Sequence, residues 1–119
     1  MNFNTYVNQW KDSNNLYDGA VFFMCGYKKM FEDVGMFDGF SFKPVFCEDD
    51  DFLIRAKIGG YQLKTCGSAI TYHFVSQTSR FSDDMKDVRE NVELASNRNF
   101  VRKWGIPIMT FQQINYQQI

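Results

Sequence analysis

The stretch Phe46-Cys47-Glu48-Asp49-Asp50-Asp51-Phe52-Leu53-Ile54-Arg55 places four consecutive acids directly before an apolar segment that ends in a base. Adjacent carboxylates repel one another, but the unpaired N–H groups and the dipole at a helix N-terminus offset that repulsion. The stretch therefore predicts a helix that begins at the acids and stops at Gly59-Gly60. Within it, Asp51 and Arg55 lie one turn apart in the order that favours an ion pair.

The four acids have two interpretations. Asp49 lies on a different side of the predicted helix from Asp51 and could point into a cleft. A carboxylate in a cleft can act as a general base or as a ligand of a hard cation. Alternatively, the acids form a solvated helix start without a chemical role. Composition does not decide between these two interpretations.

Composition restricts the classes of protein to consider. A chain of 119 residues with 45% hydrophobic content predicts one folded domain over residues 1–119. The net charge of −1 argues against nucleic acid or an anionic membrane surface as a main partner. No apolar run reaches the roughly 18 residues of a membrane span, and the N-terminus carries no signal-like region. We therefore expect a soluble, cytoplasmic protein with no membrane span.

The three cysteines, Cys25, Cys47 and Cys66, are odd in number and widely spaced, without a Cys-x-x-Cys pair. This pattern favours free thiols in a reducing compartment over a disulfide framework or a zinc site. No neighbour in sequence would activate them, so we expect small, buried, unreactive side chains.

Periodicity and turn signals predict the remaining elements. Before the acidic helix we expect a helix over 5–11, a strand over 20–25 buried on both faces, and a helix over 28–34 closed by Gly35. After it we expect strands over 61–66 and 69–74, then a long helix over 83–104 with an apolar stripe formed by Met85, Val88, Val92 and Ala95. Gly105 and Pro107 would end that helix, and the tail from Thr110 would be extended or loosely held. The prediction is a mixed α/β fold with about three core strands and three helices.

Several pieces of the chain occur in an order that resembles a known family. They are an apolar strand, a basic pair, Phe31-x-x-Val34-Gly35-x-Phe37-Asp38, Glu48-Asp49-x-Asp51-x-x-x-Arg55, Gly60-Tyr61, His73, Asn97-Arg98 and Lys103-Trp104-Gly105. Together they resemble the C-terminal, acceptor-side half of family 2 glycosyltransferases with the GT-A fold, over residues 17–105. The resemblance implies a partial GT-A-like mixed sheet flanked by helices, with a long C-terminal helix.

The resemblance also implies a reaction. Members of the family transfer a sugar from a nucleotide-diphosphate donor to an acceptor hydroxyl, such as that of a glycan, usually with inversion. A base takes the acceptor proton, and a divalent Mn or Mg ion offsets charge on the leaving diphosphate. Asp49 matches the family's base. Glu48, Asp51 and Arg55 would support it, with Asp51 holding the helix and Arg55 in place.

Four further residues gain a role only through the resemblance. His73 matches a position that helps to bind the metal or contacts the diphosphate, although a strand-end histidine bonded to backbone is the structural alternative. Lys28 and Lys29 occupy the place where the family usually carries arginine near the acceptor, which implies that they bind the acceptor, although solvated lysines are the simpler interpretation. Asp38 would cap or close a loop.

The nucleotide-binding half of the family has no counterpart in these residues, and no Asp-x-Asp motif precedes Phe46. Two hypotheses follow. The chain is the acceptor-side part of a glycosyltransferase, active only when a nucleotide-binding half is supplied by a partner chain or a longer precursor. Alternatively, it is a non-catalytic structural or interaction module on a degenerate glycosyltransferase scaffold. Exposed inter-half surface would favour a partner chain or a homo-oligomer in either case.

Overall fold

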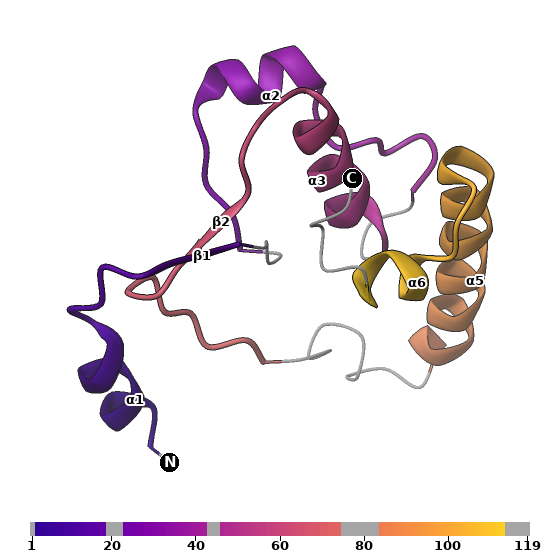
Figure 1. Cartoon of the computed structure of the whole chain (residues 1–119). Coiled ribbons are helices and arrows are strands. Elements are labelled where there is room, and N and C mark those ends of the chain that lie inside the picture. Colours follow the sequence, from indigo (N-terminus) through magenta and orange to yellow (C-terminus); the bar gives the residue numbers. More distant parts are fainter. Residues whose placement is uncertain (1, 19–22, 43–45, 75–83, 114–119) are drawn as a thin grey trace.

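The computed structural model of the chain describes residues 2–18, 23–42, 46–74 and 84–113, with the backbone alone at 84–89 and 111–113. Helices and strands alternate irregularly, so the fold is mixed α/β as predicted (Figure 1). The elements are α1 (Phe3–Trp10), β1 (Leu16–Asp18), α2 (Lys28–Val34), α3 (Glu48–Ile58), β2 (Lys64–Cys66), α5 (Asp84–Trp104) and α6 (Ile108–Gln113).

Helix α3 begins and ends where the sequence predicts. Cys47 precedes it in the left-handed conformation, with φ at 70°, and the four acids fill the first turn. At the other end Gly59 donates its N–H to the Arg55 carbonyl over 2.9 Å, and Gly60 has φ at 88°. Apolar residues on several sides of the helix are buried, namely Phe52, Leu53, Ile54 and Ala56. A helix buried on several sides belongs to the interior of a domain.

The hydrophobic core lies between α3 and the C-terminal helices. Phe42, Cys47, Ile54 and Phe100 form its buried cluster. Four partly buried residues pack against this cluster, namely Phe46, Trp104, Ile106 and Ile108. The core therefore joins α3 to the end of α5 and to α6.

The buried face of α5 differs from the predicted stripe. Ser96 and Phe100 are buried, whereas of the predicted stripe Val92 is half-buried and Ala95 is exposed. The side chains of Met85 and Val88 lie outside the described residues. Among the described side chains of α5, those in the core lie in the second half of the helix, at Phe100 and Trp104.

Helix α2 packs on the other side of α3. The rings of Phe31 and Phe37 each lie 5.0 Å from the ring of Phe52, between centroids. Gly35 closes α2 with φ at 78°, a conformation that glycine adopts without a Cβ penalty. The predicted bounds of this helix are confirmed.

The expected sheet is largely absent from the described residues. β1 and β2 form a two-stranded antiparallel ribbon, in which Leu16 faces Cys66 and Asp18 faces Lys64. Only the last three residues of the predicted strand 61–66 are in the ribbon, and 69–74 is not a strand. In the predicted buried strand 20–25, residues 20–22 lie outside the described part, while 23–25 are not a strand and Phe23 is exposed.

Two further predictions need correction. Helix α1 begins at Phe3, before the predicted start, because Asn2 caps it by accepting the Asn4 N–H over 2.8 Å. The residues around Thr110 are not extended, since α6 starts immediately after Pro107. Proline both ends a preceding helix and favours the start of the next one. In Figure 1, α1 and α5 lie at opposite ends of the molecule.

None of the helices in the described part of the chain combines the length and the apolar character needed to cross a bilayer.

Candidate functional site

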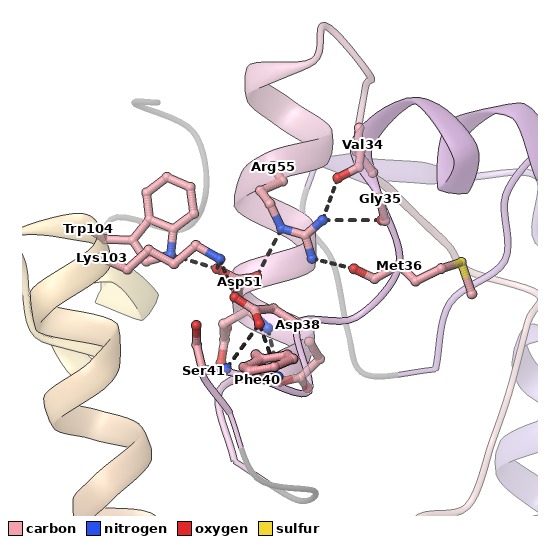
Figure 2. Close-up of polar contacts among 12 residues, drawn as sticks. Val34, Gly35, Met36, Asp38, Phe40, Ser41, Asp51, Arg55, Lys103 and Trp104 are labelled. Carbon is pink, nitrogen blue, oxygen red and sulfur yellow. Dashed lines mark hydrogen bonds and ion pairs between the residues drawn. The ribbon is translucent and has the colours of Figure 1, made fainter.

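Asp51 is the centre of a polar network inside the protein (Figure 2). Its side chain is 0% exposed. Oδ2 accepts a hydrogen bond from Arg55 Nε over 2.9 Å, which is the ion pair that the spacing predicts. Oδ1 accepts from Trp104 Nε1 over 2.9 Å and lies 2.8 Å from Lys103 Nζ. Because three donors surround the carboxylate, its burial is compensated.

Arg55 extends this network to the loop after α2. Its guanidinium donates to the carbonyl oxygens of Val34, Gly35 and Met36, at 3.1 Å for Gly35 and 2.9 Å for Met36. Figure 2 shows the side chain reaching from α3 toward these three backbone groups. The end of α2 is therefore fixed to α3 by one side chain that uses the fork geometry of arginine.

Asp38 joins the same network from the loop between α2 and α3. Oδ2 pairs with Lys103 Nζ over 2.8 Å, and Oδ1 accepts the backbone N–H groups of Phe40 and Ser41. The Lys103 hydrogen bond and the Ser41 N–H hold the pKa of the Asp38 carboxyl well below its usual range. The prediction that Asp38 closes a loop is confirmed.

Lys103 thus lies between two carboxylates. Burial opposes the charge of its ammonium group, but the hydrogen bonds to Asp38 and Asp51 outweigh that effect and raise the Lys103 pKa. The ammonium also lies 5.6 Å from the ring centroid of Phe42 and 5.7 Å from that of Trp104. It stays charged at neutral pH and neutralises part of the acidic cluster.

Asp49 and Glu48 are the less buried acids of this turn. Both are half-buried, while Asp50 and Asp51 are buried, so the turn as a whole is not a solvated helix start. Asp49 Oδ1 accepts the N–H of Asp50 over 2.9 Å, a local contact within the turn. The remaining surface of the Asp49 carboxylate is what a base at this position would use.

His73 lines a cavity of about 520 Å³ beside α3. Phe52, Leu53 and Ala56 contribute the α3 wall of this cavity, but Asp49 is not among the lining residues. Asp49 lies three, four and seven positions before these residues and therefore on the same helix face, about one turn toward the N-terminus. Asp49 and His73, to which the resemblance gives the roles of base and metal ligand, thus do not line one cavity, although both lie along one side of α3.

The two lysines of α2 form exposed ion pairs along their own helix. Lys28 Nζ lies 3.2 Å from Glu32, and Lys29 Nζ lies 2.8 Å from Asp33. Asp33 also accepts the hydroxyl of Tyr61 over 2.6 Å. These contacts match the simpler interpretation of solvated lysines, and pairs of this kind contribute little stability.

The three thiols are free, as predicted, but they differ in environment. Cys47 is buried, and burial and the neighbouring acids raise its pKa to about 12. Cys25 and Cys66 are exposed, which corrects the expectation that all three are buried. A hydrogen bond with the Ser68 hydroxyl, 3.2 Å from Cys66 Sγ, lowers the Cys66 pKa. Ser68 was missed because its effect depends on the turn after β2.

A divalent cation does not fit the described donor groups. Nowhere in the described ranges do three His, Cys, Asp or Glu side chains come together as a ligand set. The described lining of the cavity beside His73 includes the thiols of Cys25 and Cys66 but no carboxylate. Mn and Mg prefer oxygen ligands, so His73 alone does not define a site for either ion.

Comparison of the chain with family models, with curated proteins and with solved structures found no match in any of the three. The residues that sequence reasoning used least, Lys103 and Trp104, are central to the geometry of the site. Their signal was present only as part of the Lys103-Trp104-Gly105 segment, which does not reveal a contact with Asp51.

Proposed function

We propose that the chain is the acceptor-side part of a glycosyltransferase that resembles family 2, and that a nucleotide-binding half completes it. In the completed enzyme a sugar would pass from a nucleotide-diphosphate donor to an acceptor hydroxyl, such as that of a glycan. Asp49 would accept the proton of that hydroxyl as its oxygen attacks the anomeric carbon.

One observation carries the proposal. The separate segments on which the resemblance rests meet at Asp51: Arg55 joins it to Gly35 and Met36, Lys103 joins it to Asp38, and Trp104 binds it directly. Chance similarity of short motifs would not require segments 53 positions apart to bind one another. The convergence therefore supports reading the motifs as one functional unit.

In this unit the carboxylates have separate tasks. Asp51 and Asp38 are occupied by cationic and N–H donors, so they stabilise the acidic turn and the loop before it. Asp49 is half-buried, and its one local hydrogen bond leaves the other oxygen for an acceptor. The metal that the resemblance implies would depend on ligands of the other half, because the described residues supply no suitable set.

The experiment is a transfer assay with and without a nucleotide-binding half. Candidate halves are proteins with a βαβ nucleotide-binding pattern and an Asp-x-Asp motif, expressed with this chain and supplied with Mn and a panel of nucleotide sugars. We expect no turnover by the chain alone and turnover by the complex. In the complex, Asp49→Asn should reduce kcat by at least about 100-fold, since an amide has nearly the same shape but does not accept the proton. Turnover by the purified chain alone, or an active Asp49→Asn complex, would refute the proposal.

Glu32→Gln is the matched control for that variant. It also converts a carboxylate into an amide, but on the exposed face of α2. We expect it to leave turnover unchanged. Circular dichroism of both variants separates loss of chemistry from loss of fold.

The second candidate function is a non-catalytic interaction module. The observation that favours it is that Asp49 is absent from the cavity lined by His73. Exposed large apolar residues, including Phe23, Phe40 and Tyr27, would then mark a surface for a partner chain or a second copy. A stable oligomer in light scattering, unchanged by nucleotide sugars and inactive with every candidate half, would support this candidate over the first.

A further inference from the structure

The cavity beside α3 has the size of a small-molecule site. Its volume of about 520 Å³ lies within the roughly 300–1,000 Å³ typical of ligand pockets. It is built from parts of the chain that are far apart in sequence: the segment before α2, α2 itself, α3, and the segment from Gln62 to His73. Such a cavity depends on the folded arrangement of the chain and not on one loop.

The lining combines an apolar wall with polar side chains, most of which are amides and hydroxyls. Met24, Met30, Phe52, Leu53 and Ala56 supply the apolar part. Amide and hydroxyl groups come from the residues Gln62, Thr65 and Thr71. An apolar surface of this kind is unfavourable in contact with water, and hydrogen-bonding groups at its border orient a ligand.

The charges of the lining indicate an uncharged ligand. Among the described lining residues there is no Asp or Glu, so a cation would find no counter-ion. The one lysine, Lys64, is already paired with Asp18 on the facing strand. An anion would therefore have to compete with that ion pair.

We propose that this cavity binds an uncharged, mainly apolar small molecule that carries a hydroxyl or carbonyl group. The apolar body packs against the α3 wall, and the polar group exchanges hydrogen bonds with the amide and hydroxyl side chains around Thr65. This binding goes beyond the sugar transfer proposed above and needs neither Asp49 nor a nucleotide-binding half.

Two thiols of the lining serve as reporters of occupancy. Cys25 and Cys66 both line the cavity and are exposed, whereas Cys47 is buried in the core. A ligand in the cavity covers the first two and leaves Cys47 unaffected. The chain thus contains two reporters and an internal reference.

The test uses 1-N-phenylnaphthylamine, an uncharged aromatic probe with one N–H group, added to the full chain. We expect saturable binding of one probe per chain with a rise in fluorescence. We also expect alkylation of Cys25 and Cys66 by iodoacetamide, followed by peptide mass spectrometry, to slow at least fivefold at saturation. Thr71→Trp places a large ring at the cavity and should weaken binding at least tenfold.

Thr5→Trp is the matched control, because it makes the same replacement on α1, outside the lining. It should bind like the unmodified chain. The proposal is overturned if the probe binds without protecting the two thiols, if no saturable binding occurs, or if a folded Thr71→Trp protein binds as well as the control. Thiol protection is measured on the unmodified chain, so the test does not depend on the variant folding. Loss of this proposal leaves the transfer assay unaffected, and the reverse also holds.

Discussion

The indole Nε1 of Trp104 lies 2.9 Å from Oδ1 of Asp51, and this hydrogen bond joins the last turn of α5 to the first turn of α3 across 53 positions of sequence. Trp104→Phe keeps most of the ring but removes the N–H. A hydrogen bond to a charged group contributes about 1.5–3 kcal/mol, so we expect the free energy of unfolding to fall by about that amount. Urea unfolding followed by circular dichroism measures the change. Trp10→Phe in α1 is the control and should cost less than about 1 kcal/mol.

Removing either member of the Asp51–Lys103 pair should lower the free energy of unfolding. The effects of the two substitutions should not be additive. Asp51→Asn leaves two cations and an indole N–H facing a neutral amide, and breaking a buried pair in this way costs about 3–5 kcal/mol. In the Asp51→Asn protein, Lys103→Met should lower the free energy of unfolding by less than it does in the unmodified chain. This difference corresponds to a coupling energy of about 1–3 kcal/mol. A double-mutant cycle in urea measures this coupling.

The exposed Lys28–Glu32 pair on α2 provides the control cycle. Lys28→Met with Glu32→Gln should show a coupling below about 0.5 kcal/mol, because solvent screens this pair. Equal couplings in the two cycles would contradict the central role of Asp51.

Acid should destabilise the protein through Asp38. Its folded pKa lies below the ordinary value of 3.8 because of Lys103 and the Ser41 N–H. Above about pH 5 the carboxyl is ionised in both the folded and the unfolded state, so its contribution is constant. Below about pH 4 the unfolded chain takes up the proton first, and stability is lost as the pH falls. The free energy of unfolding should therefore decrease less between pH 5 and pH 2.5 in Asp38→Asn than in the unmodified chain.

Asp12→Asn, in the exposed turn after α1, is the comparison for this experiment. Its acid dependence should follow that of the unmodified chain. Parallel curves for all three proteins would show that the Asp38–Lys103 contact does not contribute to acid stability.

The Cys66 thiol should lose reactivity when Ser68 is replaced. The Ser68 hydroxyl favours the thiolate, so Ser68→Ala should raise the Cys66 pKa and lower the thiolate fraction near pH 7.5. We expect alkylation of Cys66 to slow about two- to fivefold, while Cys25 in the same sample keeps its rate. An unchanged Cys66 rate would mean that the hydrogen bond with Ser68 does not persist in solution.

The helices were predictable because their signals are local. Gly35 after α2 and Gly60 after α3 adopt positive φ values that favour glycine, and the four acids mark the start of α3. Strands lack such signals, because a strand is defined by its partner. Leu16–Asp18 became β1 only because it pairs with Lys64–Cys66, and the apolar run after Ala69 has no strand beside it in the described residues.

The same distinction applies to the candidate site. The Asp51–Arg55 pair follows from a spacing of four on one helix and was predictable. The binding of Lys103 and Trp104 to Asp51 depends on how α5 crosses α3, which no local pattern specifies. The cavity beside His73 depends on four segments at once and was therefore beyond prediction from the sequence.

The long sequence interval within the Asp51 network has a consequence for biosynthesis. At about 5–20 residues per second, a ribosome adds Trp104 roughly 3–10 s after Asp51. During that interval the nascent α3 has Arg55 nearby but neither the indole nor the ammonium that compensates burial of the Asp51 carboxylate. We therefore expect the acidic turn to stay hydrated until Lys103 and Trp104 are available to bind Asp51. Until then Phe42 lacks Phe100, its partner in the buried cluster.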